Sequence, residues 1–264
     1  ITFLFCQLPD EQKIKIDKWD INYLKVGKGP HNVLCLPGAL GTIWTDFKPQ
    51  IEGFDKDKFT IVVWDPPGYG KSRPPNKEFT ADFYEKDADY AAQFMKALKI
   101  PEYSVLGWSD GGTTSFIHAA KYPDAVLKLV AFATNSFILP HEVDWYKNIS
   151  AWSEKMRKPF EEVYGKDVLP QYWAEWTDSM TTTVYNRDNG NICSQLLKDI
   201  KCPTFILYGE KDPMVDPSHT SYLLTHIARS RLHLYPNGKH NIHINYAEDF
   251  NKRESKAKCF TSNN

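Results

Sequence analysis

The stretch YSVLGWSDGG, residues 103–112, decides the fold of this chain. Residues 103–106 form an apolar run typical of a buried strand, and residues 112–121 have the spacing of an amphipathic helix. Between them lies the pattern G-x-S-x-G, centred on Ser109. A serine on a sharp strand-to-helix turn needs glycines two residues before and after it, because larger residues would clash with the backbone. The stretch therefore predicts an exposed nucleophilic serine where a helix begins.

Further strand-like runs lie on both sides of this stretch, separated by longer helix-like segments. They are residues 32–36, 59–64, 127–133, 204–208 and 231–235. Such alternation is typical of a parallel sheet covered by helices on both faces. Residues 13–17 and 20–25 alternate polar and apolar side chains, which predicts an antiparallel hairpin at the sheet edge. The predicted fold class is α/β, with a mostly parallel central sheet flanked by helices.

The alternation stops between residues 135 and 197. This segment contains many charges and many large aromatic residues, among them Trp145, Tyr146, Trp152, Tyr164, Tyr172, Trp173 and Trp176. It is too long for a simple crossover and too aromatic for a disordered linker. We expect a helical cap over the end of the sheet, inserted into a core domain of residues 1–134 and 198–264. An ordinary run of packed surface helices is the alternative.

The composition narrows the possible partners. The chain has 264 residues, 42% of them hydrophobic, which suits one large catalytic domain. Lys and Arg total 32 against 33 for Asp and Glu, so no basic field is present to bind nucleic acid or an anionic membrane. No apolar run reaches the roughly 18 residues that a membrane span needs. We expect a monomer that binds a small-molecule substrate.

The cysteines and the first residues of the chain indicate in which cellular compartment the protein is located. The cysteines are Cys6, Cys35, Cys193, Cys202 and Cys259. They are scattered and form no C-x-x-C pair, which predicts a reducing compartment and no structural metal. Residues 1–8 lack the basic region and cleavage site of a signal peptide. Because the chain starts without Met, we expect a processed or incomplete start. The predicted location is intracellular and soluble, either mitochondrial or cytoplasmic.

Two further residues complete a predicted catalytic triad. Asp212 follows the run 204–208, where a buried carboxylate would orient a histidine and stabilise its protonated form. Glu210 and Asp216 are the alternatives for this acid. His240 lies in a polar loop after the last strand and is the predicted base, with His243 as the alternative. The resulting order of serine, acid and histidine is typical of α/β-hydrolases.

Three further motifs could bind an oxyanion, a metal ion or a phosphate. The glycine-rich turn 37–41 follows a central strand, so the backbone N–H of Ala39 and that of Asp110 are the predicted oxyanion donors. A plain glycine-rich strand exit is the alternative. The H-x-x-H spacing of His240 and His243 lacks a third zinc ligand, so we expect no metal. Residues 65–72 do not have P-loop spacing, which argues against a phosphate cradle.

These motifs resemble the valacyclovir hydrolase family, the biphenyl hydrolase-like proteins of the α/β-hydrolase superfamily. The similarity covers residues 13–251. Its most specific blocks are LPGALG (36–41), WDPPGYGKSRPP (64–75), LGWSDGG (106–112), NGNIC (189–193), GEKDP (209–213) and SRLHLYPNGKHN (230–241). The resemblance implies hydrolysis of α-amino-acid esters, including prodrug esters and homocysteine thiolactone, without a cofactor. It also implies the triad Ser109, Asp212 and His240, with Asp110 binding the substrate ammonium.

Two features depart from the family pattern, and two other functions remain open. Pro67 stands where relatives tend to have Arg, in a segment that we interpret as a surface turn. After Asn251 the apolar pattern is lost, which leaves the packing of the last helix open.

Carbon-carbon bond hydrolases are the enzymatic alternative, although Asp110 should repel their anionic substrate. A non-catalytic binding protein on a hydrolase scaffold is the other alternative, and the intact triad argues against it.

Overall fold

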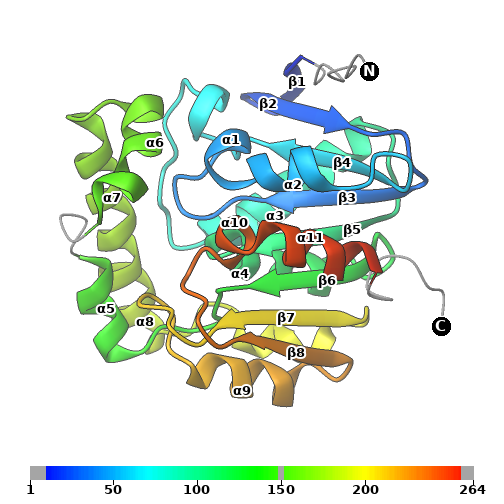
Figure 1. The fold of residues 1–264 in the computed structure, drawn as a ribbon. Coiled ribbons are helices and arrows are strands. Elements are labelled where there is room, and N and C mark those ends of the chain that lie inside the picture. The colour runs from blue at the N-terminus through cyan, green and yellow to red at the C-terminus, as the bar shows by residue number, and fades with distance from the viewer. Residues whose placement is uncertain (1–9, 148–151, 257–264) are drawn as a thin grey trace.

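The computed structural model describes residues 10–147 and 152–256. An eight-stranded sheet runs through these residues in the order β1-β2-β4-β3-β5-β6-β7-β8 (Figure 1). The strands are β1 (Gln12–Ile16), β2 (Trp19–Val26), β3 (His31–Leu36), β4 (Phe59–Trp64), β5 (Tyr103–Trp108), β6 (Val126–Phe132), β7 (Thr204–Gly209) and β8 (Ser230–Tyr235). β1 pairs antiparallel with β2, and β2 pairs antiparallel with β4, whereas every later pairing is parallel. The predicted fold class is confirmed.

Helices cover both faces of the sheet. One face carries α1 (Ile43–Asp46), α2 (Lys48–Gly53), α10 (Ile242–Asn245) and α11 (Ala247–Lys256). The other carries α3 (Phe83–Ala97), α4 (Asp110–Lys121), α9 (Ser218–His226) and the 3₁₀ helix η4 (Ser194–Asp199). Figure 1 shows α2, α10 and α11 in front of the sheet, with α3 and α4 behind it. The sheet is therefore the middle of three layers.

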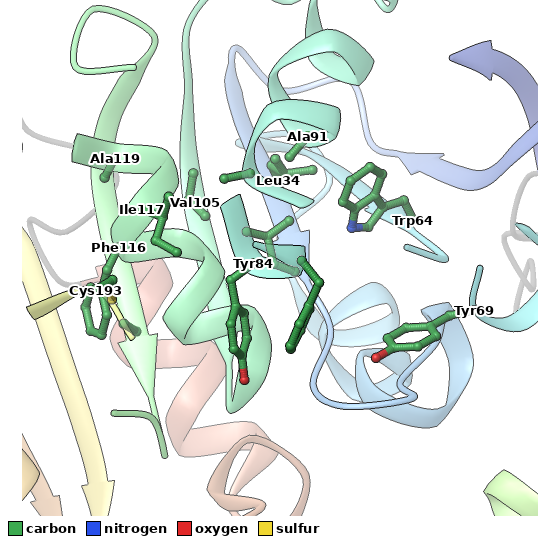
Figure 2. Close-up of a cluster of buried hydrophobic side chains, with 14 of the residues drawn as sticks. Leu34, Trp64, Tyr69, Tyr84, Ala91, Val105, Phe116, Ile117, Ala119 and Cys193 are labelled. Carbon is green, nitrogen blue, oxygen red and sulfur yellow. The ribbon is translucent and has the colours of Figure 1, made fainter. Parts of the chain in front are cut away.

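Side chains that alternate along the strands feed two hydrophobic clusters. In β3, Val33 and Cys35 pack on the side of α2 and α11, whereas Leu34 and Leu36 pack on the side of α3 and α4. All six residues of β4 are buried, as expected for a strand covered on both faces. Figure 2 shows part of the cluster on the side of α3 and α4. In it, the hydroxyl oxygen of Tyr84 points away from Leu34. The core thus reaches the carboxyl ends of the strands.

The switch in chain direction fixes where a site can form. The chain leaves β3 for β4 on one side and returns to β5 on the other side of β3. Loops that leave the carboxyl ends of β3 and β5 therefore diverge, and in open α/β sheets ligands bind in the crevice at such a point. The turn after β3 and the G-x-S-x-G turn after β5 both lie here.

A group of helices lies across the carboxyl ends of the strands (Figure 1). It consists of α5 (Pro140–Tyr146), α6 (Glu154–Tyr164), α7 (Val168–Asp178), the π-helical segment η3 (Ser179–Tyr185) and α8 (Asn186–Asp188). An antiparallel bridge between Phe137 and Asn191 joins the two ends of this excursion. The division into a core (1–134 and 198–264) and a cap (135–197) stays a prediction.

The proline-rich turn after β4 does not lie at the surface. Pro67 is buried, and cap helices cover the residues around it. The Tyr172 hydroxyl donates to the Gly68 carbonyl at 2.6 Å, and the Gly70 N–H donates to the Tyr164 hydroxyl at 3.1 Å. The interpretation of this segment, which includes the 3₁₀ turn η1 (Gly70–Ser72), as a surface turn is therefore wrong.

Three of the five cysteines can be assessed. Cys35, Cys193 and Cys202 are buried and free. Cys6, Cys259 and the opening residues 1–8 lie outside the described residues. Within residues 10–147 and 152–256, no group of three or more His, Cys, Asp or Glu side chains could hold a metal ion. In the same part of the chain, no helix has the length and apolar character needed to cross a membrane.

The last described helix is anchored by one aromatic side chain. Phe250 in α11 is fully buried, with its ring centre 5.0 Å from that of Phe132 in β6. We expect Phe250→Ala to lower the free energy of unfolding by about 3–5 kcal/mol, because it leaves a cavity between helix and sheet. Urea unfolding measures this change. Lys252→Ala, at an exposed position of the same helix, is the control and should change it by less than about 0.5 kcal/mol. Equal effects would contradict this packing.

Candidate active site

Ser109 occupies a strained turn between β5 and α4. Its backbone angles are φ 54° and ψ −122°, a region that residues with a side chain rarely adopt. A Cβ atom on Gly107 would lie 2.5 Å from the Gly111 carbonyl oxygen. One on Gly111 would lie 2.0 Å from the carbonyl oxygen of Leu36 at the end of β3. Both glycines of the motif are therefore required by close backbone contacts, as predicted.

The three side chains of the predicted triad meet at this turn. His240 Nε2 lies 3.0 Å from Ser109 Oγ, and His240 Nδ1 lies 2.9 Å from Asp212 Oδ2. The Asp212 side chain is fully buried, and its Oδ1 accepts hydrogen bonds from the backbone N–H groups of Met214 and Val215. This arrangement can pass a proton from the serine to the histidine and stabilise the charge that forms there.

Backbone contacts tie the loop of the acid to the loop of the histidine. The Lys211 N–H donates to the Gly238 carbonyl at 2.9 Å, and a Cβ on Gly209 would lie 2.5 Å from the same carbonyl group. On the other side, Trp108 Nε1 donates to the His240 carbonyl at 3.0 Å. The histidine is therefore held between the ends of β5 and β7, although its own loop follows β8.

The alternative candidates lie elsewhere. Glu210 is exposed, and the Asp216 carboxylate lies 3.0 Å from His141 Nε2. His243 is in α10, where its Nε2 lies 2.9 Å from the Asp46 carbonyl oxygen. Burial lowers the pKa of His243 to about 3. Of the predicted site residues, the structure brings together Ser109, Asp212 and His240.

Ala39 and Asp110, the two residues predicted to supply oxyanion donors, lie beside Ser109. Both line the same cavity as Ser109, and the Asp110 N–H has no intrahelical acceptor because this residue begins α4. The Gly41 N–H donates to the Gly38 carbonyl at 2.9 Å, which fixes the peptide plane between Gly38 and Ala39. Because a trans peptide directs its N–H away from its C=O, the Ala39 N–H points to the opposite side. The two amides can serve as a pair of oxyanion donors.

A buried carboxylate holds the turn that carries Ala39. Asp46 in α1 is fully buried, and its Oδ2 accepts from the Gly38 N–H at 2.9 Å. Its Oδ1 accepts from the Thr45 hydroxyl at 2.7 Å. Burial raises the pKa of Asp46 to about 7. Asp46 and the bond from Gly41 to Gly38 together hold two successive peptide planes of the turn.

The Asp110 carboxylate points toward the cap. Its Oδ1 accepts from the Tyr84 hydroxyl at 2.8 Å, and its Oδ2 accepts from Trp176 Nε1 at 2.7 Å. Tyr84 comes from α3 and Trp176 from α7, so this carboxylate joins the core to the cap. Burial raises the pKa of Asp110 to about 6, and these two hydrogen bonds limit the rise.

A second buried carboxylate joins the cap to the loop that carries Asp212. Glu142 in α5 is fully buried, accepts from the Asp216 N–H at 2.8 Å and lies 3.0 Å from His219 Nε2. It also accepts from the Leu139 N–H at 2.8 Å, at the start of the same helix. The first cap helix is therefore attached to the residues that position the acid.

Two cavities meet at Ser109. A small one, about 30 Å³, contains Asp110 and is walled by one residue of α3 and five of the segment 135–197: Tyr84, Asn135, Ile138, Tyr146, Trp176 and Met180. A larger groove, about 460 Å³, runs from Ser109 and His240 between α6 and α10. Ala39, Trp173 and Met214 border both. The serine can therefore be reached by a substrate with a small part and a large part.

The sequence did not identify several residues around the site. These residues hold the site through contacts with parts of the chain that lie well away in sequence. They are Tyr84, Trp176, Asp46 and Glu142. Trp176 was expected only as one of the cap aromatics. Asp46 lies within the segment that follows the glycine-rich turn, but no motif singles it out.

Comparison with known proteins identifies the family of this chain. The sequence model of a family described as the alpha/beta hydrolase fold matches residues 31–167, and one described as serine aminopeptidase, S33, matches residues 179–246. The chain belongs to the α/β-hydrolase family, and it is a serine hydrolase.

Its relatives include a named enzyme of this class. The chain is 45% identical over 243 residues to the serine hydrolase BPHL of Mus musculus and to that of Homo sapiens, with 91% of this chain and 83% of each relative covered. An alpha/beta hydrolase fold protein from Chitinophaga pinensis has a TM-score of 0.74 at 21% identity, covering 93% of this chain and 95% of that one. The resemblance to the biphenyl hydrolase-like proteins is confirmed.

The raised pKa of Asp46 predicts a pH-dependent stability. The unfolded chain releases this proton near pH 3.8, whereas the folded chain retains it up to about pH 7. The stabilisation is therefore fully present below pH 3.8 and lost as the pH rises through about 7. Relative to Asp46→Asn, the free energy of unfolding of the wild type should fall over this interval by a few kcal/mol, on the order of 1.4 kcal/mol per pH unit.

Urea unfolding of both proteins at several pH values measures this difference. Asp57→Asn, at a side chain that is 80% exposed, is the control and should run parallel to the wild type. If the free energy of unfolding of Asp46→Asn also ran parallel to that of the wild type across this pH range, the pKa of Asp46 would not be raised in the folded protein.

Proposed function

We propose that this serine hydrolase cleaves esters of small α-amino acids through an acyl-enzyme formed on Ser109. The observation that carries the proposal is the coincidence of two features at one turn. Ser109 Oγ lies 3.0 Å from His240 Nε2, and the carboxylate of the next residue, Asp110, lines the small cavity beside it. A nucleophile and an anionic group therefore lie within the length of one aminoacyl group.

In the proposed mechanism, Ser109 Oγ attacks the ester carbonyl carbon while His240 Nε2 takes its proton. Asp212 keeps Nδ1 of the imidazole protonated and stabilises the resulting imidazolium. His240 then gives the proton to the departing alcohol oxygen. Water, deprotonated by His240 in turn, hydrolyses the acyl-enzyme and restores the serine. No metal or organic cofactor takes part in these steps.

The oxyanion forms between two backbone donors in this proposal. The N–H groups of Ala39 and Asp110 donate to the carbonyl oxygen as it becomes negative. The hydrogen bonds from Gly38 to Asp46 and from Gly41 to Gly38 support this role, because they hold the turn in place before the reaction. Donors that are already oriented need no reorganisation when charge develops.

Asp110 is proposed to bind the α-ammonium of the substrate. Each carboxylate oxygen receives one neutral donor, from Tyr84 and from Trp176, and each retains a further lone pair for a cation. The neutral donors fix the orientation of the carboxylate without neutralising it. An ammonium would offset the unfavourable charge that Asp110 places near the oxyanion. The small size of this cavity favours a small acyl side chain.

We expect Ser109→Ala to lower kcat by about 10³- to 10⁶-fold while the fold is retained, because only the attacking hydroxyl is removed. Rates with an alanyl ester and labelling by a fluorophosphonate probe measure the loss, with circular dichroism as the test of folding. Ser136→Ala, at a serine whose hydroxyl bonds to Ser194, is the control and should keep both activity and labelling. A variant at position 109 with more than a tenth of the wild-type rate would refute the assignment.

We expect Asp110→Asn to reduce kcat/KM on α-amino-acid esters by roughly 10- to 150-fold, which is the value of a charged hydrogen bond. Matched neutral acyl esters should keep or gain activity. In the wild type, kcat/KM on amino esters should rise through about pH 6 as Asp110 ionises, since only the carboxylate attracts the ammonium.

The ratio of the two substrate types at each pH isolates this effect, because the protonation of His240 affects both. Equal losses on both esters, in a folded Asp110→Asn variant, would assign Asp110 a structural role only. That result would leave the serine hydrolase mechanism in place and remove the preference for amino acids.

A further inference from the structure

Apolar side chains line both sides of the larger groove. On the cap side it is lined by Met156, Pro159 and Phe160 of α6, and on the core side by Trp108 and Ile244. The rings of Trp152, Phe160 and Trp173 form a continuous aromatic wall, with Trp152 4.5 Å from Trp173 and 5.7 Å from Phe160 between ring centres. A wall of this kind suits an aromatic or similarly flat group.

This groove lies on the side of the site from which a leaving group departs. In the proposed function, the amino end of the substrate occupies the small cavity at Asp110, so the other half of the ester extends away from it. His240, which must protonate the departing oxygen, lines the groove together with its neighbours Lys239 and Asn241. The groove therefore receives the alcohol.

The charges in the groove are all of one sign. Lys155 and Lys239 line it, both are exposed, and no Asp or Glu is among the described residues that line it. Within the described part of the chain, neither ammonium forms an ion pair with a carboxylate. The cleft thus has a carboxylate at its acyl end and, in its groove, two cations that pair with no carboxylate of residues 10–147 and 152–256.

We propose that the groove selects a leaving group that is aromatic and anionic, so that the preferred substrate has an ammonium at one end and an anion at the other. This inference rests on the proposed function and extends it to the second half of the substrate. The reaction remains a hydrolysis. The bond from the acyl carbon to the alcohol oxygen breaks, that oxygen takes the proton from His240, and water supplies the hydroxyl of the released amino acid. The anionic group takes no part in bond making.

The test compares three alanyl esters of benzyl alcohols that differ in the para substituent of the ring. They are the esters of 4-(hydroxymethyl)benzoate, of its neutral carboxamide, and of 4-(hydroxymethyl)phenyl phosphate, which separates a preference for a dianion from one for a carboxylate. We expect the wild type to have the higher kcat/KM on the anionic esters. Each of Lys155→Gln and Lys239→Gln should reduce the ratio of anionic to neutral by roughly 1.5- to 5-fold, as for exposed ion pairs.

Two controls make the comparison specific. Lys201→Gln removes an exposed cation that precedes β7 at the opposite end of the strands, and it should leave the ratio unchanged. Salt at roughly 1 M should also abolish the preference in the wild type, since the screening length is then about 3 Å. The wild type and Lys201→Gln should cleave the neutral ester at similar rates.

The outcomes separate this inference from the function on which it rests. Cleavage of every ester with a ratio near one, or a ratio that the double variant of Lys155 and Lys239 leaves unchanged, would overturn the inference alone. Failure to cleave any alanyl ester, in a protein that still reacts with a fluorophosphonate, would overturn both the proposed substrate class and the inference.

Discussion

The contact between the first turn of α4 and the last residue of β3 determines how the rest of the site is arranged. Gly111 lies so close to the Leu36 carbonyl that even a methyl group would not fit, with a Cβ only 2.0 Å from that oxygen. This approach is possible because β3 and β5 are neighbours at the point where the chain changes direction. It brings the turn of Ser109 against the turn of Ala39, so that the serine and the proposed oxyanion donors belong to one rigid unit.

Around this contact, the loops that carry the site residues are held in place by individual hydrogen bonds to neighbouring helices and strands. Asp46 holds the turn of Ala39 from α1, Trp108 holds the His240 backbone from β5, and Glu142 holds the loop of Asp212 from α5. Asp46 and Glu142 are fully buried and accept several hydrogen bonds each, as buried carboxylates require. Loops that would otherwise be the least ordered parts of the structure are thereby tied to helices and strands.

The sequence predicted the strands to within one or two residues, because the runs at residues 59–64 and 204–208 are buried on both faces and read as continuous apolar segments. It also predicted Ser109, Asp212 and His240, since each follows a strand in a recognisable loop. It missed Tyr84 and Trp176, which meet Asp110 across 26 and 66 residues of chain. Such contacts depend on how cap helices lie on the core, which no local pattern encodes. The same cause made the turn at Pro67 appear exposed.

In the proposed function, the hydrogen bond from Trp176 to Asp110 gives α7 a direct part in selectivity. With a raised pKa of about 6, Asp110 gains a proton more readily than an ordinary carboxyl group, and any ligand that further excludes water without supplying a cation will favour that proton. A bound ammonium has the opposite effect and stabilises the carboxylate. The protonation state of Asp110 is therefore linked to the class of substrate bound, and so is the strength with which it accepts from Trp176. A cap closed over an ammonium should be held more firmly than one closed over a neutral acyl group.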